Sequence, residues 1–299
     1  AASPSPAEQG RHPSQSQNFG RNVRVDWVAI PEDVTELLQT QQGIIREVPI
    51  SCRKQWIAAL QFSLAEILRN PMSEKAWGLF ILLPRLLLRR TKPRLDVGDE
   101  NNYRVLHERF QKFFDGQWRN LLEEIQGSPS QMRPDKRSKY DKARDCVHRG
   151  YGLSKARQLI DGAKEAPRNE HTARRLQEQR NMTQIPLPPE LFQNIPAALD
   201  LDHEKFVSNV RSAKRGKSGG CAGLVTEHLR LLMSDEDVGI GSLEEVARLL
   251  AQGRVPPHAQ RALALGRMSG LDKRGVDVRG ITAGHTLRRL VARTVAQQY

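Results

Sequence analysis

Apolar residues recur every three or four positions along most of this 299-residue chain. This spacing places them on one face of an amphipathic α-helix. The most regular stripe lies between residues 51 and 70 and consists of Trp56, Ile57, Leu60, Leu64, Ile67 and Leu68. Ser51 stands where it would cap this helix, and Pro71 is expected to end it. The pattern predicts a mainly α-helical protein.

Some residues within the apolar pattern are expected to break or begin helices. Pro84 should kink or interrupt a helix that begins at Ser73, because proline lacks an amide hydrogen and collides with the preceding turn. Gly116 is expected to divide the long helical pattern of residues 101–126 into two pieces. Farther along, Ser242 is predicted to open a helix, since acidic residues follow it.

One stretch near the end of the chain departs from helical spacing. Residues 268–273 and 277–281 are predicted to be antiparallel strands joined over a turn that contains Arg274 and Gly275. The predicted fold class is therefore mainly α. It has a multi-helix N-terminal region and a helical C-terminal region that carries one small β-hairpin.

Composition shifts along the chain divide it into predicted segments. These are a disordered N-terminal segment at 1–25, a helical N-terminal domain at 26–126, a helical hairpin region at 131–182, a Pro-rich linker at 183–200, and a C-terminal region at 201–299.

Charge and cysteine content narrow the class of protein. Lysine and arginine number 47 and aspartate and glutamate 34, so the formal charge of +13 favours polyanionic partners. Nucleic acid is the first candidate and an anionic membrane surface the second, although many basic soluble proteins bind neither. Cys52, Cys146 and Cys221 lie far apart without a CxxC pair, which argues against a zinc site or a disulfide framework and indicates a reducing compartment.

Neither end of the sequence nor its interior resembles a membrane segment. The N-terminal residues have no apolar signal-peptide region and do not begin with Met, which predicts a flexible part of a longer product. The longest apolar run, residues 79–88, contains Pro84 and Arg85 and is about half of the ~20 residues that a membrane span requires. We therefore expect a soluble, intracellular protein without a membrane partner.

Two basic stretches are candidates for phosphate binding. The cluster from Arg89 to Arg94 is either a phosphate contact or a solvated helix C-terminus, where cations suit the helix dipole. GKSGG at 216–220 resembles the end of a nucleotide-binding P-loop, but Arg211 stands where that motif needs glycine. Nucleotide hydrolysis is therefore not expected. The turn either holds a phosphate or only allows a tight entry into the next helix.

Aromatic residues gather on the predicted helical stretch 101–126, namely Tyr103, Phe110, Phe113, Phe114 and Trp118. Because arginine and lysine lie between them, they are either a base-stacking platform or, as is commoner at helical spacing, part of the core. A pair of short helices around Gly150 and Gly152 only weakly indicates DNA docking, since this unit is a general packing motif.

The predicted hairpin is the third candidate site. Lys273 and Arg279 would project from it, with Arg274 beside them at its tip. A triphosphate accepts point-charge hydrogen bonds from lysine and forked hydrogen bonds from arginine. The histidines are scattered singly, without an HExxH motif or a nucleophile elbow, so no catalytic residue and no metal ligand is predicted.

Several short motifs in residues 210–299 occur in an order that resembles one polymerase family. They are a basic Gly-containing turn, GLVTEHLR, a helix ending in GRVPP, LDKRGVDVRGI and LRRLVARTVAQQ. This succession resembles the fingers region of reverse transcriptases from non-LTR (LINE-like) retrotransposons. The upstream helices, including AWGLFILLPRLLLRR, more loosely resemble the N-terminal extension of such polyproteins.

The resemblance implies part of an RNA-directed DNA polymerase. Lys273 and Arg279 match the fingers residues that grip the phosphates of the incoming nucleotide. Other cations are expected to contact RNA or DNA template-primer, namely Arg215, Lys217, Arg274, Arg288 and Arg289. Three positions depart from the family pattern: Ala222, Val276 and Gly280 stand where Asp, Gly and Pro are usual.

Catalysis by this family requires more than the fingers. Its polymerases hold two divalent metal ions with palm aspartates, and the present sequence ends at Tyr299 without an AspAsp pair. We therefore expect an inactive fragment of a longer polyprotein, with no cofactor of its own, although a complete polymerase would need Mg²⁺. The family implies a nuclear location, with the cytoplasm as the alternative. The alternative function is a non-enzymatic, basic α-helical nucleic-acid-binding or scaffold protein.

Overall fold

A computed structural model describes residues 23–90, 100–127, 137–162, 165–167, 169–180, 199–234, 238–273 and 277–299. The predicted N-terminal segment 1–25 and the linker 183–200 fall almost entirely outside these residues.

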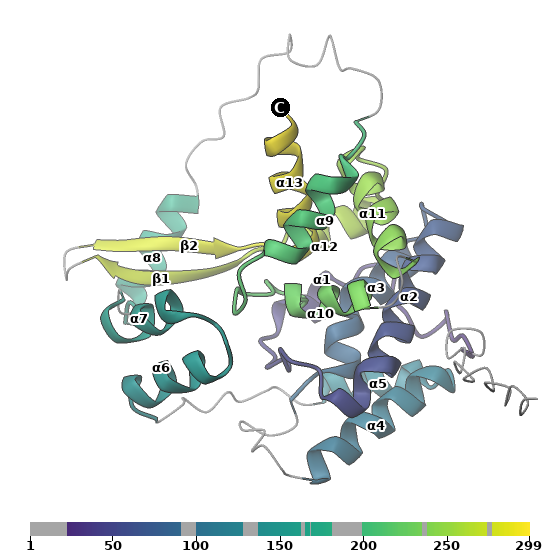
Figure 1. Ribbon diagram of the computed structural model, residues 1–299, viewed down its shortest axis with the longest axis horizontal. Coiled ribbons are helices and arrows are strands. Elements are labelled where there is room, and N and C mark those ends of the chain that lie inside the picture. The colour runs from purple at the N-terminus through teal and green to yellow at the C-terminus, as the bar shows by residue number, and fades with distance from the viewer. Residues whose placement is uncertain are drawn as a thin grey trace, which may run out of the picture.

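The described part of the chain is mainly helical and carries one two-stranded antiparallel sheet (Figure 1), which confirms the predicted fold class. The N-terminal helices are α1 (Thr35–Gln39), α2 (Arg53–Arg69), α3 (Glu74–Leu87), α4 (Glu100–Phe114) and α5 (Trp118–Gln126). The middle helices are α6 (Lys139–His148), α7 (Leu153–Asp161) and α8 (Glu170–Arg180). The C-terminal elements are α9 (His203–Ser212), α10 (Thr226–Arg230), α11 (Val238–Ala251), α12 (Pro257–Ala264), β1 (Arg267–Lys273), β2 (Asp277–Ala283) and α13 (Thr286–Gln298).

Helix α3 lies at the centre of the larger helical body and packs against α2, α4, α5 and α12. Every residue from Ala76 to Leu87 is buried. Of the two effects predicted for Pro84, an interruption of the helix is wrong, because α3 continues through it and the Leu88 amide still donates to the Pro84 carbonyl at 2.9 Å. A kink stays a prediction. Burial on all sides of the helix outweighs the one backbone hydrogen bond that proline cannot make.

The predicted helix boundaries have mixed outcomes. Ser73 caps α3 by accepting the Ala76 amide at 3.2 Å, and Gly116, with φ of +76°, separates α4 from α5 as predicted. Ser51 caps nothing, because it lies in a short 3₁₀ turn ahead of α2. Ser242 does not open a helix either, since α11 already begins at Val238.

Most of the aromatic residues of α4 and α5 form part of the core, whereas Tyr103 is exposed. Phe110, Phe113 and Trp118 are fully buried, and the rings of Phe113 and Trp118 stack at 5.7 Å. The Trp118 indole donates a hydrogen bond to the Phe113 carbonyl at 2.8 Å, so its polar atom is satisfied without solvent. The core interpretation is confirmed for these residues, and a base-stacking platform is not available there.

The N-terminal and C-terminal helices share one hydrophobic core. Helix α11 packs on α2, while α13 packs on α9 and α11. Polar contacts inside this core also join the two halves, and in one of them the Trp56 indole donates to the carbonyl of His228 at 3.2 Å. The hairpin, with α6, α7 and α8 near it, lies to one side of this body (Figure 1).

Candidate nucleic-acid interface

The predicted hairpin is confirmed and is slightly longer than expected. In its register Leu271 pairs with Arg279 and Lys273 pairs with Asp277. The turn 274–276, and with it Arg274, lies outside the described residues, as does the side chain of Lys273.

Both outer edges of the hairpin are occupied by neighbouring segments. Along β2, the Gln179 side chain of α8 donates to the Val278 carbonyl at 2.6 Å and accepts the Gly280 amide at 2.9 Å. Along β1, the Ala166 amide donates to the Gly270 carbonyl at 3.0 Å. These bonds satisfy edge groups that would otherwise attract another strand, and they fix the ribbon in place.

Helix α8 also fixes the hairpin electrostatically. Its Arg175 donates two hydrogen bonds, at 2.9 and 3.1 Å, to one carboxylate oxygen of Asp277. Sequence reasoning missed Arg175 and Gln179. They lie on a charged helix, and no nearby sequence pattern indicates that this helix contacts a strand about a hundred residues later.

One face of the ribbon is exposed around Arg279 and Ile281. Side chains alternate between the faces of a strand, and α8 lies against Gly270 and Gly280 together with the buried Val278. Arg279 therefore points to the opposite face, where it is exposed and forms no hydrogen bond or ion pair with any described residue. Ile281, two residues along the same face, is 47% exposed. A free guanidinium beside an apolar side chain can contact both a phosphate and a sugar or base.

The other predicted cations differ in their surroundings. Lys217 and Arg288 are exposed. Arg289 instead donates to the Ser218 carbonyl and, at 3.0 Å, to the Thr286 hydroxyl, which ties α13 to the basic turn. Arg215 forms an ion pair with Glu47 at 3.2 Å. Arg289 thus has a structural contact in addition to its predicted role.

The Gly-rich turn at 216–220 does not present a free set of amides. The Gly216 amide donates to the Glu227 carboxylate at 2.6 Å, and the Gly220 amide donates to the Ser218 hydroxyl at 3.3 Å. A buried carboxylate under the turn repels an anion that approaches its backbone. Of the two interpretations of this turn, the geometry favours a tight entry into α10.

Gly223 and Gly241 make opposite predictions for stability. Gly223 has φ of +81°, and an added Cβ would collide with Ile44, so Gly223→Ala should lower the free energy of unfolding by about 2–4 kcal/mol. Gly241 lies inside α11 with open space around it, so Gly241→Ala should raise this free energy by about 0.5–1 kcal/mol. Urea unfolding of both variants checks the prediction, which fails if the two changes have the same sign.

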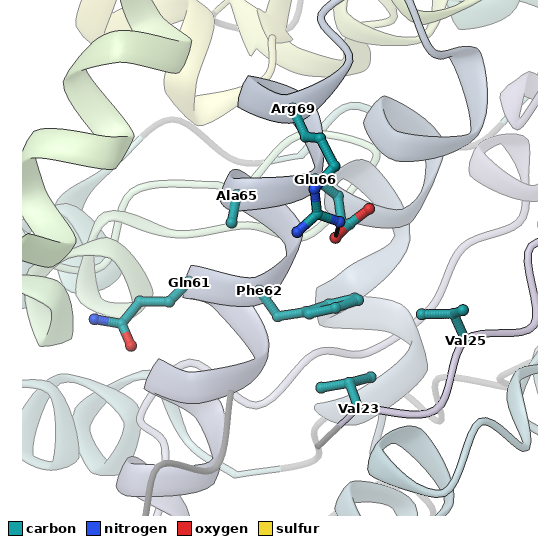
Figure 2. A pocket seen from close by; sticks show the side chains of 7 residues that line it. All are labelled: Val23, Val25, Gln61, Phe62, Ala65, Glu66 and Arg69. Carbon is teal, nitrogen blue, oxygen red and sulfur yellow. Dashed lines mark hydrogen bonds and ion pairs between the residues drawn. The ribbon is translucent and has the colours of Figure 1, made fainter. Parts of the chain in front are cut away.

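A separate hollow of about 380 Å³ lies between the segment at Val23 and Val25 and helix α2 (Figure 2). The Phe62 ring points toward the two valines, and an ion pair between Glu66 and Arg69 lies at one side. None of the residues predicted to bind phosphate lines it. The hollow is therefore lined mainly by apolar side chains, and its two charged residues neutralise each other. Its described lining does not form a recognisable catalytic arrangement.

Comparisons with protein-family models, with curated proteins and with solved structures give no match for this chain. Among the described residues, no helix combines the length and the apolar character needed to cross a bilayer. Within the same residues, His, Cys, Asp and Glu side chains nowhere gather in groups of three that could hold a metal ion.

Proposed function

We propose that this chain is the N-terminal extension and fingers part of an RNA-directed DNA polymerase of the non-LTR retrotransposon type. In this proposal the hairpin holds the phosphates of a nucleoside triphosphate, and the surrounding cations hold the RNA or DNA template-primer. The catalytic aspartates and their Mg²⁺ ions would belong to a further part of the same polyprotein.

The observation that carries the proposal is the free guanidinium of Arg279 on the open face of a braced ribbon. An arginine that is needed for stability would be paired, as Arg175 is with Asp277. Holding an exposed, unpaired arginine on a rigid strand reduces the conformational entropy that is lost when an anion binds. In the hairpin register Arg279 pairs with Leu271, and Lys273 lies two residues from Leu271 on the same strand. The positions of Lys273 and Arg279 are therefore close together in the ribbon.

Electrostatics supports a polyanionic ligand. The formal charge of +13 attracts nucleic acid over long range. Phosphoryl transfer depends mainly on positioning and charge stabilisation, and cations that hold the triphosphate supply part of both. The hairpin residues would orient the nucleotide and neutralise its charge, while the chemical step would take place elsewhere in the polyprotein.

Replacing Arg279 by alanine should weaken the binding of a fluorescent nucleoside triphosphate about tenfold or more, because a charge-assisted hydrogen bond is lost. Fluorescence anisotropy at several salt concentrations measures this. Arg144→Ala is the control, since Arg144 is 72% exposed on α6 and, among the described residues, forms an ion pair only with Asp141. Equal affinity of the wild type and the Arg279 variant would contradict the proposal. RNA binding without any triphosphate binding would favour the scaffold alternative.

A further inference from the structure

Arginines from distant parts of the chain meet on the side of the molecule where the basic turn 214–217 lies. The end of α3 runs beside the segment 43–46, since the Arg90 amide donates to the Gly43 carbonyl and the Ile45 amide to the Leu88 carbonyl, both at 2.8 Å. This pairing brings Arg90 next to Arg46. Both side chains are partly buried.

The turn between α6 and α7 joins the same place. The Arg215 guanidinium lies against Gly150 and over the Tyr151 ring, 5.9 Å from its centre. Arg215 also pairs with Glu47, the neighbour of Arg46, at 3.2 Å. Arg149, which precedes this turn, is thereby placed in the same cluster. We call Arg46, Arg90, Arg149 and Arg215, together with Tyr151, the arginine cluster.

Carboxylates neutralise only part of this charge. Glu47 pairs with Arg215, while Asp145 is shared at 3.1 and 3.2 Å between Arg149 and Arg137. Glu227, the third carboxylate nearby, already accepts the Gly216 amide.

Two members of the cluster are left without a carboxylate. Arg46 and Arg90 form no ion pair with any residue that the structure describes. Burial lowers the pKa of Arg90, and repulsion from Arg46 and Arg149 lowers it further.

One atom of the cluster lacks a hydrogen-bond acceptor. The Nε–H group of Arg90 is buried and has no hydrogen-bond partner among the residues that the structure describes. Buried donors in native proteins are almost always satisfied, and a charged one costs more when it is not. An anionic oxygen between Arg90 and Arg46 would supply the acceptor and relieve the repulsion between the two cations at once.

We propose that the arginine cluster is a phosphate site for the backbone of a nucleic-acid strand. The exposed Lys214 and Lys217 add positive charge beyond the amount that one phosphate would neutralise, which favours a strand with several phosphates. The Tyr151 ring offers a surface for a base or sugar. This site shares no residue with the Lys273 and Arg279 hairpin. It rests on the proposed function, because the ligand is a nucleic acid and because Arg215 and Lys217 are among the cations predicted to contact the template-primer.

The test uses the full chain and a fluorescent 20-nucleotide single-stranded RNA, with affinity measured at 50 to 300 mM salt. Replacing both Arg46 and Arg90 by glutamine should weaken binding about tenfold at 0.1 M salt. It should also reduce the slope of log K against log salt by about 0.7, because the two side chains would share one phosphate. Arg144→Gln with Arg157→Gln is the matched control, because it also removes two positive charges. These side chains are 72% and 85% exposed, and among the described residues they form ion pairs only with Asp141 and Asp161 of their own helices. The control variant should change neither quantity.

A second pair of variants guards against misfolding. If the melting temperature of the Arg46/Arg90 double variant differs from that of the wild type by more than a few degrees, Arg149→Gln with Arg215→Gln takes its place. Both of these side chains are exposed, and this second double variant should show the same loss of RNA affinity. Unchanged RNA affinity and slope in a folded double variant would overturn the inference. An equal loss in the Arg144/Arg157 double variant would also overturn it, because the effect would then be one of net charge.

Two further outcomes separate the possible ligands and the two proposals. If inorganic phosphate stabilises the wild type but not the double variant while RNA binding is unaffected, the site takes free anions and the nucleic-acid assignment falls. The double variant should keep the triphosphate affinity of the wild type. If the cluster variants lose RNA binding while Arg279→Ala leaves triphosphate binding unchanged, this inference stands and the proposed nucleotide site fails.

Discussion

Replacing Arg85 by methionine is expected to lower the free energy of unfolding by about 3 kcal/mol or more. Arg85 lies in the last turn of α3 and is only 2% exposed, and burial lowers the pKa of its guanidinium to about 10. At neutral pH the group therefore stays charged inside the core. A buried charge of this kind is tolerated only where hydrogen bonds replace its hydration.

Backbone carbonyls supply these hydrogen bonds. The Arg85 guanidinium donates to the carbonyls of Leu37, Leu38 and Thr40, at 2.9 Å for the latter two, and to Cys221 at 3.1 Å through Nε. It thereby joins α3 to the end of α1 and to the Gly-rich turn. Methionine would leave these carbonyls buried without donors, each at a cost of about 1–3 kcal/mol before relaxation.

Urea unfolding followed by circular dichroism measures the effect of this change. Arg104→Met is the matched control, since Arg104 is 73% exposed on α4 and forms only a surface pair with Glu108, for which we expect about 0.5 kcal/mol or less. Arg85→Lys should fall between the two, because an ammonium group reaches fewer of the carbonyls. If Arg85→Met lowers the free energy of unfolding by no more than Arg104→Met does, water takes over the hydrogen bonds of the guanidinium.

The case of Arg85 shows why sequence patterns predicted the elements better than their contacts. Helical spacing identified α2, α4 and α5, and alternation around a Gly-containing turn identified the hairpin, since both signals are local. In the apolar run 79–88, Arg85 counted only as an interruption. Its acceptors lie 45 to 136 residues away in sequence, where no periodicity connects them to it.

The basic cluster that follows α3 shows the same limit. A solvated helix C-terminus was one interpretation of residues 89–94, and it is wrong for Arg89, which is buried and pairs with Glu124 at 3.2 Å. Arg109 and Lys112 reach the same carboxylate. The sequence shows a run of cations but not the single acid, thirty-five residues later, that neutralises the first of them. Residues 91–94 lie outside the described part of the chain.

The candidate site was predictable only in its local part. The register that pairs Leu271 with Arg279 follows from the turn and strand pattern. Which face stays open does not, because it depends on where α8 docks. Likewise Arg215 was recognised from its basic run, whereas Arg46 and Arg149 join it through packing between distant segments.

Two buried histidines are expected to make the protein lose stability as the pH falls from about 6.5 to 4.5. The His228 ring accepts the Val225 amide at 3.3 Å and lies 2.8 Å from the Ile45 carbonyl, and burial lowers its pKa to about 4. His285 is also fully buried, with neither ring nitrogen hydrogen-bonded, and burial, with a smaller contribution from Arg289, lowers its pKa to about 3. Both rings are therefore neutral in the folded protein at neutral pH.

The direction of the pH effect follows from these depressed values. Above pH 6.5 both histidines are neutral in the folded and unfolded states, so they add no pH dependence there. Below pH 6.5 the unfolded chain takes up protons that the folded protein cannot. Each histidine then removes up to about 1.4 kcal/mol per pH unit, or about 2–3 kcal/mol by pH 4.5. The two together would remove a large part of a typical domain's stability.

Variants can assign this acid sensitivity to the two rings. Urea unfolding between pH 7 and 4.5 should give a flatter dependence in His228→Gln, whose amide can both donate and accept as the neutral ring does. His285→Asn should flatten it further and can cap α13, whose N-cap side chain makes no hydrogen bond at present. His171→Gln, an exposed residue of α8, should keep the slope of the wild type. If the His228/His285 double variant keeps that slope as well, other groups cause the loss, and both rings take up protons in the folded protein as they do in the unfolded chain.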